Sequence, residues 1–133
     1  MNAAKEKSTF PASFDPVVAL QRVGGDQELL AMAIDLGIGS LPRLINAVQD
    51  ARSAGDVQAL GDAAHTLKGM AATFEARQVG PLAAKIEEIA GAGDFENAMK
   101  LIPQLEEKTK TLGEDLAEFA DRCETGDLLS LSC

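Results

Sequence analysis

Short breaks divide this chain into segments, and at most of them glycine and aspartate stand close together. Glycine commonly ends a helix and aspartate commonly caps the next one, so such a pair marks a turn between helices. Between the breaks apolar residues recur every three or four positions, and no alternating strand pattern appears. The pattern predicts five helices: from Pro16 to the Gly24-Gly25 pair, from Gln27 to Arg52, from Val57 to Phe74, from Pro81 to Ala90, and from a cap at Asp94 to Arg122.

Short loops between amphipathic helices make neighbouring helices antiparallel. We therefore expect an all-α protein, an up-and-down antiparallel four-helix bundle over residues 14–123 with an additional short N-terminal helix laid against it. Residues 1–13 are expected to form a flexible N-terminal arm and residues 124–133 a C-terminal tail. Pro42 and Pro103 fall inside predicted helices, where each removes a backbone hydrogen bond. We expect a kink at Pro103, and a kink or a break at Pro42, which follows two glycines.

The 133-residue chain carries a net charge of −9, from 12 basic and 21 acidic residues. This balance disfavours nucleic acid and anionic membranes as partners, because both are bound through basic patches. No stretch is apolar for long enough to suggest a membrane span or the core of a signal peptide, so we expect a cytoplasmic protein, and we expect a monomer. Cys123 and Cys133 are too few for a disulfide framework and are expected to be ordinary reduced thiols.

The only histidine, His65, falls in the third predicted helix. With about 100° between successive residues, its side chain projects about 140° from the middle of the apolar stripe and should face solvent. An exposed helix surface ordinarily carries Glu, Lys and Gln, and two glycines inside a helix destabilise it by about 1 kcal/mol each. The surface around His65 instead indicates close approach of another macromolecule to the imidazole. It comprises a small-residue face (Gly61, Gly69, Ala72 and Ala76), with Gln58 nearby and Lys68 at one flank.

Residues 64–69 read Ala-His-Thr-Leu-Lys-Gly and resemble the A-H-x-L-K-G signature of histidine-containing phosphotransfer (HPt) domains. The similarity extends from FDPVVALQRVGGDQELL, which begins at Phe14, through VGPLAAKIEEIAGAGD, and covers residues 14–120. The chain departs from the family pattern in two places. Glu75 stands where the family usually has glycine, and Gly80-Pro81 falls in what is usually the first turn of the next helix.

The resemblance implies that His65 is the phosphorylated nucleophile and that Lys68 screens the charge of the phosphoryl group. It implies receiver domains of a hybrid histidine kinase and of a response regulator as partners, with Mg²⁺ supplied by the receiver and no cofactor or metal held by this chain. The chain lacks the nucleotide-binding loop of an autonomous kinase, so it would be a phosphocarrier and not an enzyme. The residues expected to contact the partner are Gln58, Gly61, Gly69, Ala72 and Ala76.

Two other interpretations stay open. His65 could be an ordinary solvated histidine, and the chain could be a non-catalytic docking module that binds a receiver or kinase without phosphoryl transfer. A metal site is disfavoured, because metal sites in bundles draw on several inward histidines and glutamates. A hydrolase triad would need a nucleophile and an acid that converge on His65. Arg77, Lys85 and the many acidic residues are interpreted as solvated surface charges.

Overall fold

The computed structural model describes residues 13–124, with side chains described up to Arg122. The predicted arm and tail therefore lie, apart from Ser13 and Glu124, outside the described residues. Six helices occur within the described range: α2 (Pro16–Arg22), α3 (Gln27–Ala54), α4 (Val57–Phe74), α5 (Val79–Gly91), α6 (Phe95–Lys100) and α7 (Ile102–Glu124).

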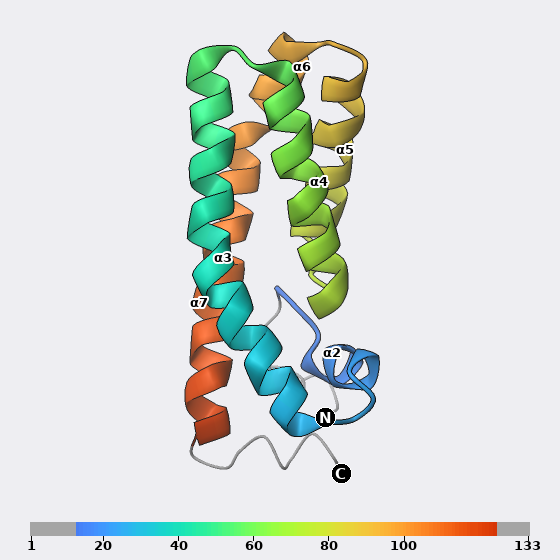
Figure 1. The fold of residues 1–133 in the computed structure, drawn as a ribbon, viewed down its shortest axis with the longest axis vertical. Coiled ribbons are helices and arrows are strands. Elements are labelled where there is room, and N and C mark those ends of the chain that lie inside the picture. Colours follow the sequence, from blue (N-terminus) through green and yellow to red (C-terminus); the bar gives the residue numbers. More distant parts are fainter. Residues whose placement is uncertain (1–12, 125–133) are drawn as a thin grey trace, which may run out of the picture.

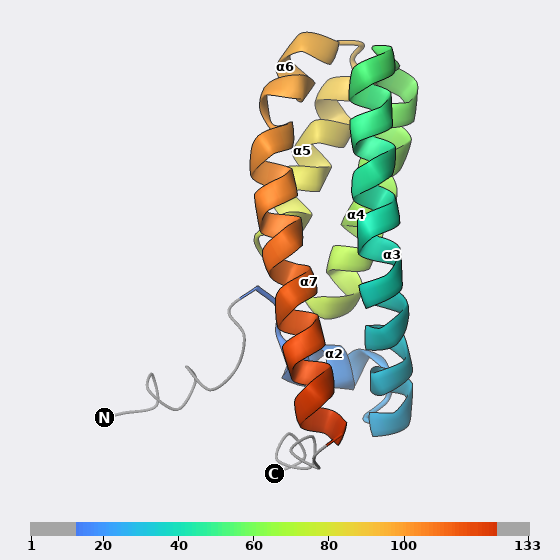
Figure 2. The ribbon, with the colours of Figure 1, turned by 90° about the vertical axis from the view of Figure 1, so that its left-hand side faces the viewer.

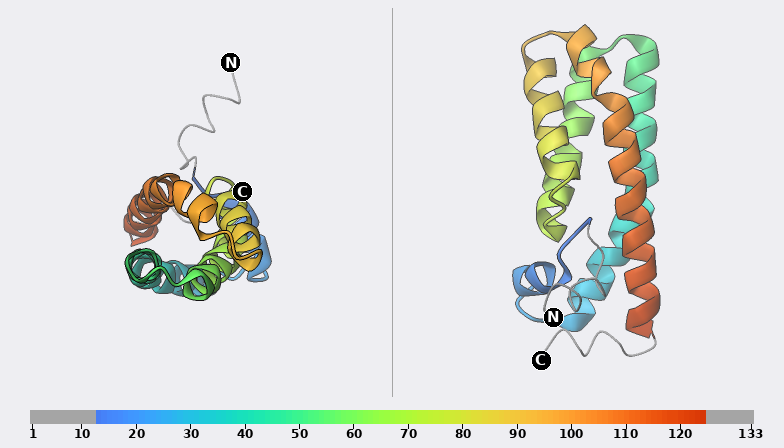
Figure 3. Two further views of the ribbon diagram at one scale, coloured as in Figure 1. Left: turned by 90° about the horizontal axis from the view of Figure 1, so that it is seen from above. Right: turned by 180° about the vertical axis from the view of Figure 1, so that it is seen from behind.

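The helices run side by side in columns and form a bundle (Figure 1). α3, α4 and α5 are three of these columns, and α6 and α7 together make the fourth (Figure 2). Seen from above, the columns surround a common interior (Figure 3), in which α4 contacts α3 and α5, and α7 contacts α3 and α5. The short α2 lies at one end of the bundle against α4 and α3. No strand occurs among residues 13–124. The predicted four-helix bundle with a short N-terminal helix is confirmed.

Aspartate caps place the starts of the first helices where the sequence predicts them. The Oδ1 atom of Asp15 accepts hydrogen bonds from the backbone N–H groups of Val17 and Val18, at 3.0 and 3.1 Å. Asp26 and Asp56 cap α3 and α4 in the same manner. Each cap satisfies backbone donors that have no partner inside the helix, and this fixes the residue at which the helix begins.

α3 runs without a break from Gln27 to Ala54, although Pro42 lies inside it. Figure 1 shows the first part of α3 inclined to the rest, as a proline inside a helix produces. Pro42 cannot donate a hydrogen bond to the carbonyl of Ile38, and its ring crowds that carbonyl. The glycines and the proline therefore bend this helix and do not divide it.

The start of α5 differs from the prediction, which placed it at Pro81. α5 begins at Val79, two residues earlier. Pro81 is the third residue of α5, and in the first turn of a helix the missing N–H group of proline has no intrahelical partner to lose. A hydrogen bond of 2.9 Å from the N–H of Gly80 to the carbonyl of Ala76 leads the chain into the helix, and Val79 is 1% exposed.

The single long final helix of the prediction is also wrong, because it is divided at Leu101 into α6 and α7. Pro103, the second residue of α7, cannot donate to the carbonyl four residues before it. The N–H of Leu101 donates a hydrogen bond of 3.1 Å to the carbonyl of Ala98, which lies three residues before it. A spacing of three residues winds the backbone more tightly than the four-residue spacing of an α-helix. Pro103 thus ends one helix and starts another.

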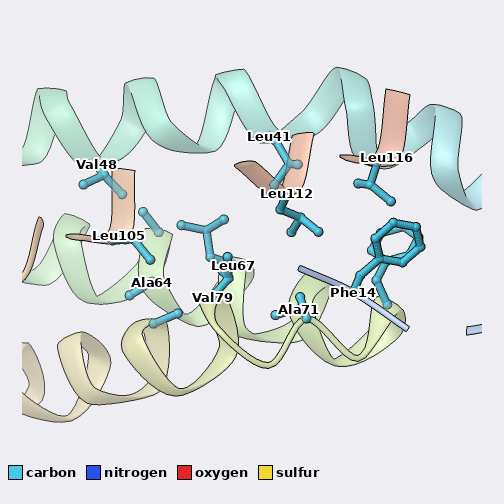
Figure 4. Close-up of a cluster of buried hydrophobic side chains, with 14 of the residues drawn as sticks. Phe14, Leu41, Val48, Ala64, Leu67, Ala71, Val79, Leu105, Leu112 and Leu116 are labelled. Atoms are coloured by element: carbon cyan, nitrogen blue, oxygen red, sulfur yellow. The ribbon is translucent and has the colours of Figure 1, made fainter. Parts of the chain in front are cut away.

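The core determines how α4 is rotated about its axis. Leu41 of α3, Leu67 of α4 and Leu112 of α7 point toward one another in Figure 4, and each is at most 3% exposed. At one end of the core Phe14 packs edge-on against Phe74 and Phe119, with ring centroids 6.2 and 5.7 Å apart. Because these side chains fix the buried face of α4, the opposite face of that helix must point to solvent.

Ser13 belongs to the fold, although the sequence suggested that it ends the arm. It is 2% exposed, and its Oγ donates a hydrogen bond of 2.6 Å to Oδ2 of Asp115 on α7. This contact joins the beginning of the described chain to the last helix.

Candidate functional site

Three ionisable side chains from two helices meet near the middle of α4. His65 Nδ1 lies 2.7 Å from Oε2 of Glu87 on α5, and Lys68 Nζ lies 2.7 Å from Oε1 of the same residue. The Glu87 carboxylate therefore bridges the two α4 side chains, using one oxygen for each. The His65 side chain is 68% exposed, so the predicted outward direction of His65 is confirmed.

The ionisation of Glu87 determines which nitrogen of His65 carries hydrogen. Hydrogen bonds from Lys68 and then from His65 lower the pKa of Glu87 below the usual value of a glutamate, so Glu87 is an anion at neutral pH. A carboxylate can only accept hydrogen bonds, so Nδ1 of His65 is the donor in this contact. In the neutral imidazole the lone pair then lies on Nε2, which is left free to act as a nucleophile.

Glu87 reaches His65 because α4 and α5 form an antiparallel hairpin. His65 lies nine residues before the end of α4 at Phe74, and Glu87 lies eight residues after the start of α5 at Val79. At about 1.5 Å per residue the two side chains are level to within about 2 Å along the helices. Glu87 was not among the site residues predicted from the sequence, because the acidic residues were interpreted as solvated surface charges. Nearly equal distances from the turn were the available signal, and the late predicted start at Pro81 concealed it.

Most of the residues expected near His65 do lie at the surface. Gln58, Gly69 and Ala72 are exposed, and Gly61 is partly buried. A Cβ atom added at Gly69 would meet no heavy atom within 4 Å. One added at Gly61 would lie 3.5 Å from the Cβ of Ala90 on α5. Gly61 thus lies where α4 and α5 approach each other, whereas Gly69 is bordered by open space.

Ala76 is not part of the exposed face, and its expected position was wrong. α4 ends at Phe74, so the helical periodicity that placed Ala76 beside His65 does not extend to it. Ala76 is 3% exposed and belongs to the core. The small-residue face is therefore Gly61, Gly69 and Ala72.

The end of α4 carries a second group of charges. Glu75, the residue after the helix, has a φ of 53°, in the left-handed region where a residue other than glycine is strained. Its carboxylate pairs with Arg22 of α2 at 2.6 Å and with Arg77 at 3.4 Å. Arg22 also donates to the backbone carbonyl of Ala72. The hydrogen bond from Arg22 is the main cause that lowers the pKa of Glu75, so ion pairs stabilise this residue in its strained conformation.

The described residues contain no group of three or more His, Cys, Asp and Glu side chains arranged to hold a metal ion. Within the same range there is no helix both long enough and apolar enough to cross a membrane.

Comparison with known proteins places these features in a family. A family model described as "Hpt domain" matches residues 33–122. Histidine-containing phosphotransfer protein B from Pseudomonas aeruginosa PAO1 has a similar structure, with a TM-score of 0.74, 24% identity and coverage of 84% of this chain and 96% of its own. The HPT domain of a sensor hybrid histidine kinase from Shewanella superposes with a TM-score of 0.76 at 15% identity, over 83% of this chain and 95% of its own. No curated protein matches the chain significantly.

The family match spans more than half of the chain, and it includes the helices that carry His65, Lys68 and Glu87. The chain therefore belongs to the Hpt domain family.

Proposed function

We propose that this protein is a phosphorelay intermediate of two-component signalling. His65 accepts a phosphoryl group from the aspartate of a receiver domain and passes it to a response regulator. The observation that carries the proposal is the exposed imidazole whose Nδ1 is held by Glu87 at 2.7 Å, so that Nε2 is free. Membership in the Hpt domain family supports it. A cytoplasmic location and a monomeric state are part of the same proposal.

In the proposed step the Nε2 lone pair attacks the phosphorus atom of an aspartyl phosphate. The nitrogen–phosphorus bond forms while the bond between phosphorus and the acyl oxygen breaks, and the receiver keeps a carboxylate. The imidazole becomes positively charged, and the Glu87 carboxylate on Nδ1–H stabilises that charge. The reverse sequence transfers the phosphoryl group to the aspartate of a second receiver, and neither leaving group needs a proton.

Lys68 supports the same step electrostatically. It lies one helical turn from His65, its side chain is 43% exposed, and its ammonium group is paired with Glu87. A phosphoryl group on Nε2 brings additional negative charge that competes with Glu87 for this flexible cation. Lys68 therefore stabilises the phosphorylated state without forming a bond to the reacting atoms.

The proposal assigns no autonomous kinase activity to the chain. The phosphoryl group comes from the receiver of a hybrid histidine kinase, and the receiver also supplies Mg²⁺. The carrier contributes the nucleophile, the carboxylate that orients it and a cation beside it. Partner specificity then depends on the surface around His65, where Gln58, Gly61, Gly69 and Ala72 are the proposed contacts.

Transfer from labelled receivers distinguishes a carrier from a docking module. Receiver domains from the same genome are phosphorylated with radiolabelled acetyl phosphate, which releases acetate, and are mixed with the wild-type protein or with His65→Gln. We expect label on the wild-type protein that survives alkali and is lost in acid, as for phosphohistidine, and no label on the variant. A receiver that binds tightly while its aspartate keeps the label would favour the docking module.

The role of Glu87 has its own matched control. Glu87→Gln removes the negative charge and allows either imidazole tautomer, so we expect phosphoryl acceptance to slow about tenfold, or about 1.4 kcal/mol in the barrier. Glu88→Gln makes the same change at the neighbouring exposed residue. Acceptance by the Glu88 variant should equal that of the wild-type protein. Equal rates for both variants would mean that Glu87 does not orient His65.

A further inference from the structure

A hollow of about 310 Å³ opens beside Lys68, between the last turns of α4 and the start of α5. Small residues make up much of its lining, among them Ala71, Ala76 and Gly80, and the first two are buried. The charged residues of the lining are Lys68, Glu75 and Arg77, and Ala72 and Pro81 complete it. The hollow lies where α4 ends at Phe74 and the chain turns into α5, at a place where the small residues Ala76 and Gly80 line it.

The hollow is continuous with the surface around His65. Ala72 lines it and also belongs to the small-residue face, while Lys68 lines it and also pairs with Glu87. Lys68 and Ala72 are one and two helical turns from His65, which puts the hollow about 5–10 Å along α4 from the imidazole. A protein interface buries about 800 Å² on each partner. Any protein that brings its active site to His65 therefore covers the hollow as well.

The charge at this place is opposite to that of the whole chain. The chain has a net charge of −9. Of the residues that line the hollow, however, two are basic (Lys68 and Arg77) and one is acidic (Glu75), which leaves one positive charge. An aspartyl phosphate is an anion, so a receiver brings negative charge to the surface around His65. The cations beside the hollow are therefore complementary to such a partner, although the net charge of the whole chain is not.

We propose that this hollow receives one large apolar side chain of the receiver domain, from the rim of the receiver's active site. The inference rests on the proposed function, and it names the part of the surface that anchors the partner. A buried apolar anchor surrounded by charged contacts is the arrangement that commonly dominates binding energy at protein interfaces. The open small-residue face then admits the receiver to His65, while the hollow holds the receiver in place.

Gly80→Leu tests this directly by filling the hollow. A Cβ atom at Gly80 would lie 3.6 Å from the Cβ of Ala71, an ordinary contact, so the added side chain extends into the open space. Gly91→Leu is the matched control, because Gly91 lies at the other end of α5 with no heavy atom within 4 Å of an added Cβ. The receiver used is the one that transfers fastest to the wild-type protein, and its dissociation constant is measured by calorimetry.

We expect Gly80→Leu to weaken receiver binding at least tenfold and Gly91→Leu to leave it unchanged. Both variants should take label from phosphoramidate, a small donor that needs no docking, at the wild-type rate. Receiver binding by Gly80→Leu equal to that of Gly91→Leu would overturn the inference and leave the proposed function intact. A wild-type protein that is labelled by phosphoramidate and by no receiver would overturn the proposed function itself.

A charge variant keeps the test decisive if Gly80→Leu unfolds. Arg77 is 74% exposed, and Glu75 keeps its shorter ion pair with Arg22 when Arg77 is replaced, so Arg77→Glu should fold. We expect it to slow association with the receiver at least threefold at low salt, with the difference shrinking as salt is added. Arg43→Glu, at an exposed site on α3, is its control. Equal association rates for these two variants would overturn the electrostatic part of the inference.

Discussion

Gly69 allows the stability of α4 to be separated from its use as a docking surface. Gly69 lies inside α4, where glycine destabilises a helix by about 1 kcal/mol relative to alanine. No heavy atom lies within 4 Å of a Cβ added there, so a methyl group introduces no steric conflict within the protein. We therefore expect Gly69→Ala to raise the free energy of unfolding by about 1 kcal/mol.

This gain converts into a measurable melting shift. Unfolding entropy is about 2.1 cal/mol/K per residue, or about 0.3 kcal/mol/K for a chain of this length, so the melting temperature should rise by about 4 °C. Gly39→Ala is the matched control inside α3, since an added Cβ also meets nothing within 4 Å. Gly37→Ala should instead destabilise, because its Cβ would lie 3.0 Å from Cε2 of Phe74. Thermal melts followed by circular dichroism measure all three variants.

The same position tests docking when the added side chain is large and acidic. Gly69→Glu keeps most of the helix gain but adds bulk and negative charge one turn from His65. We expect receiver-to-HPt transfer to fall at least tenfold, and Ala72→Glu to act similarly, while Gly39→Glu transfers normally. Loss of stability in Gly69→Ala would mean that this face is packed against the protein. Undiminished transfer to Gly69→Glu would mean that the receiver docks elsewhere.

Three further predictions follow from the site. His65→Gln should abolish phosphoryl acceptance and leave the melting temperature nearly unchanged, because an exposed side chain contributes little to the core; a large drop in that temperature would contradict the exposed position. Lys68→Ala should slow transfer about tenfold without eliminating it, as single-turnover kinetics can show, since the attacking atom remains. The depressed pKa of Glu87 means that its bridge contributes stability above the usual glutamate pKa and loses that contribution as the pH falls through the lowered value. NMR titration should therefore give a Glu87 midpoint below 4.5, and Lys68→Ala should raise it, because Lys68 is the largest cause of the shift.

Interactions between residues that are close in the sequence predicted most of the helix bounds. The prediction was wrong where a bound depends on packing that is not visible in a short stretch of sequence. The caps at Asp15, Asp26 and Asp56 act through neighbouring backbone groups, so the sequence alone predicts them. The start of α5 and the division at Leu101 depend on how proline is accommodated in a first turn and on burial of nearby side chains. These factors are not visible in a local pattern.

The candidate site shows the same limit. His65 and Lys68 are three positions apart on one helix, so their shared surface follows from helical periodicity. Glu87 comes from a different helix, and its position depends on the register of the α4–α5 hairpin. The predicted exposed position of Ala76 was wrong for a related reason, because helical periodicity was extended two residues beyond the end of α4 at Phe74.

The most direct test of the central claim is nitrogen NMR of the imidazole, which is unambiguous because the chain contains one histidine. Protein labelled with ¹⁵N in histidine is measured at neutral pH, and again after phosphorylation by its receiver. The arrangement of His65 and Glu87 predicts hydrogen on Nδ1 in the free protein and the phosphoryl group on Nε2 in the phosphorylated one. Hydrogen on Nε2 in the free protein, or a phosphoryl group on Nδ1, would contradict it.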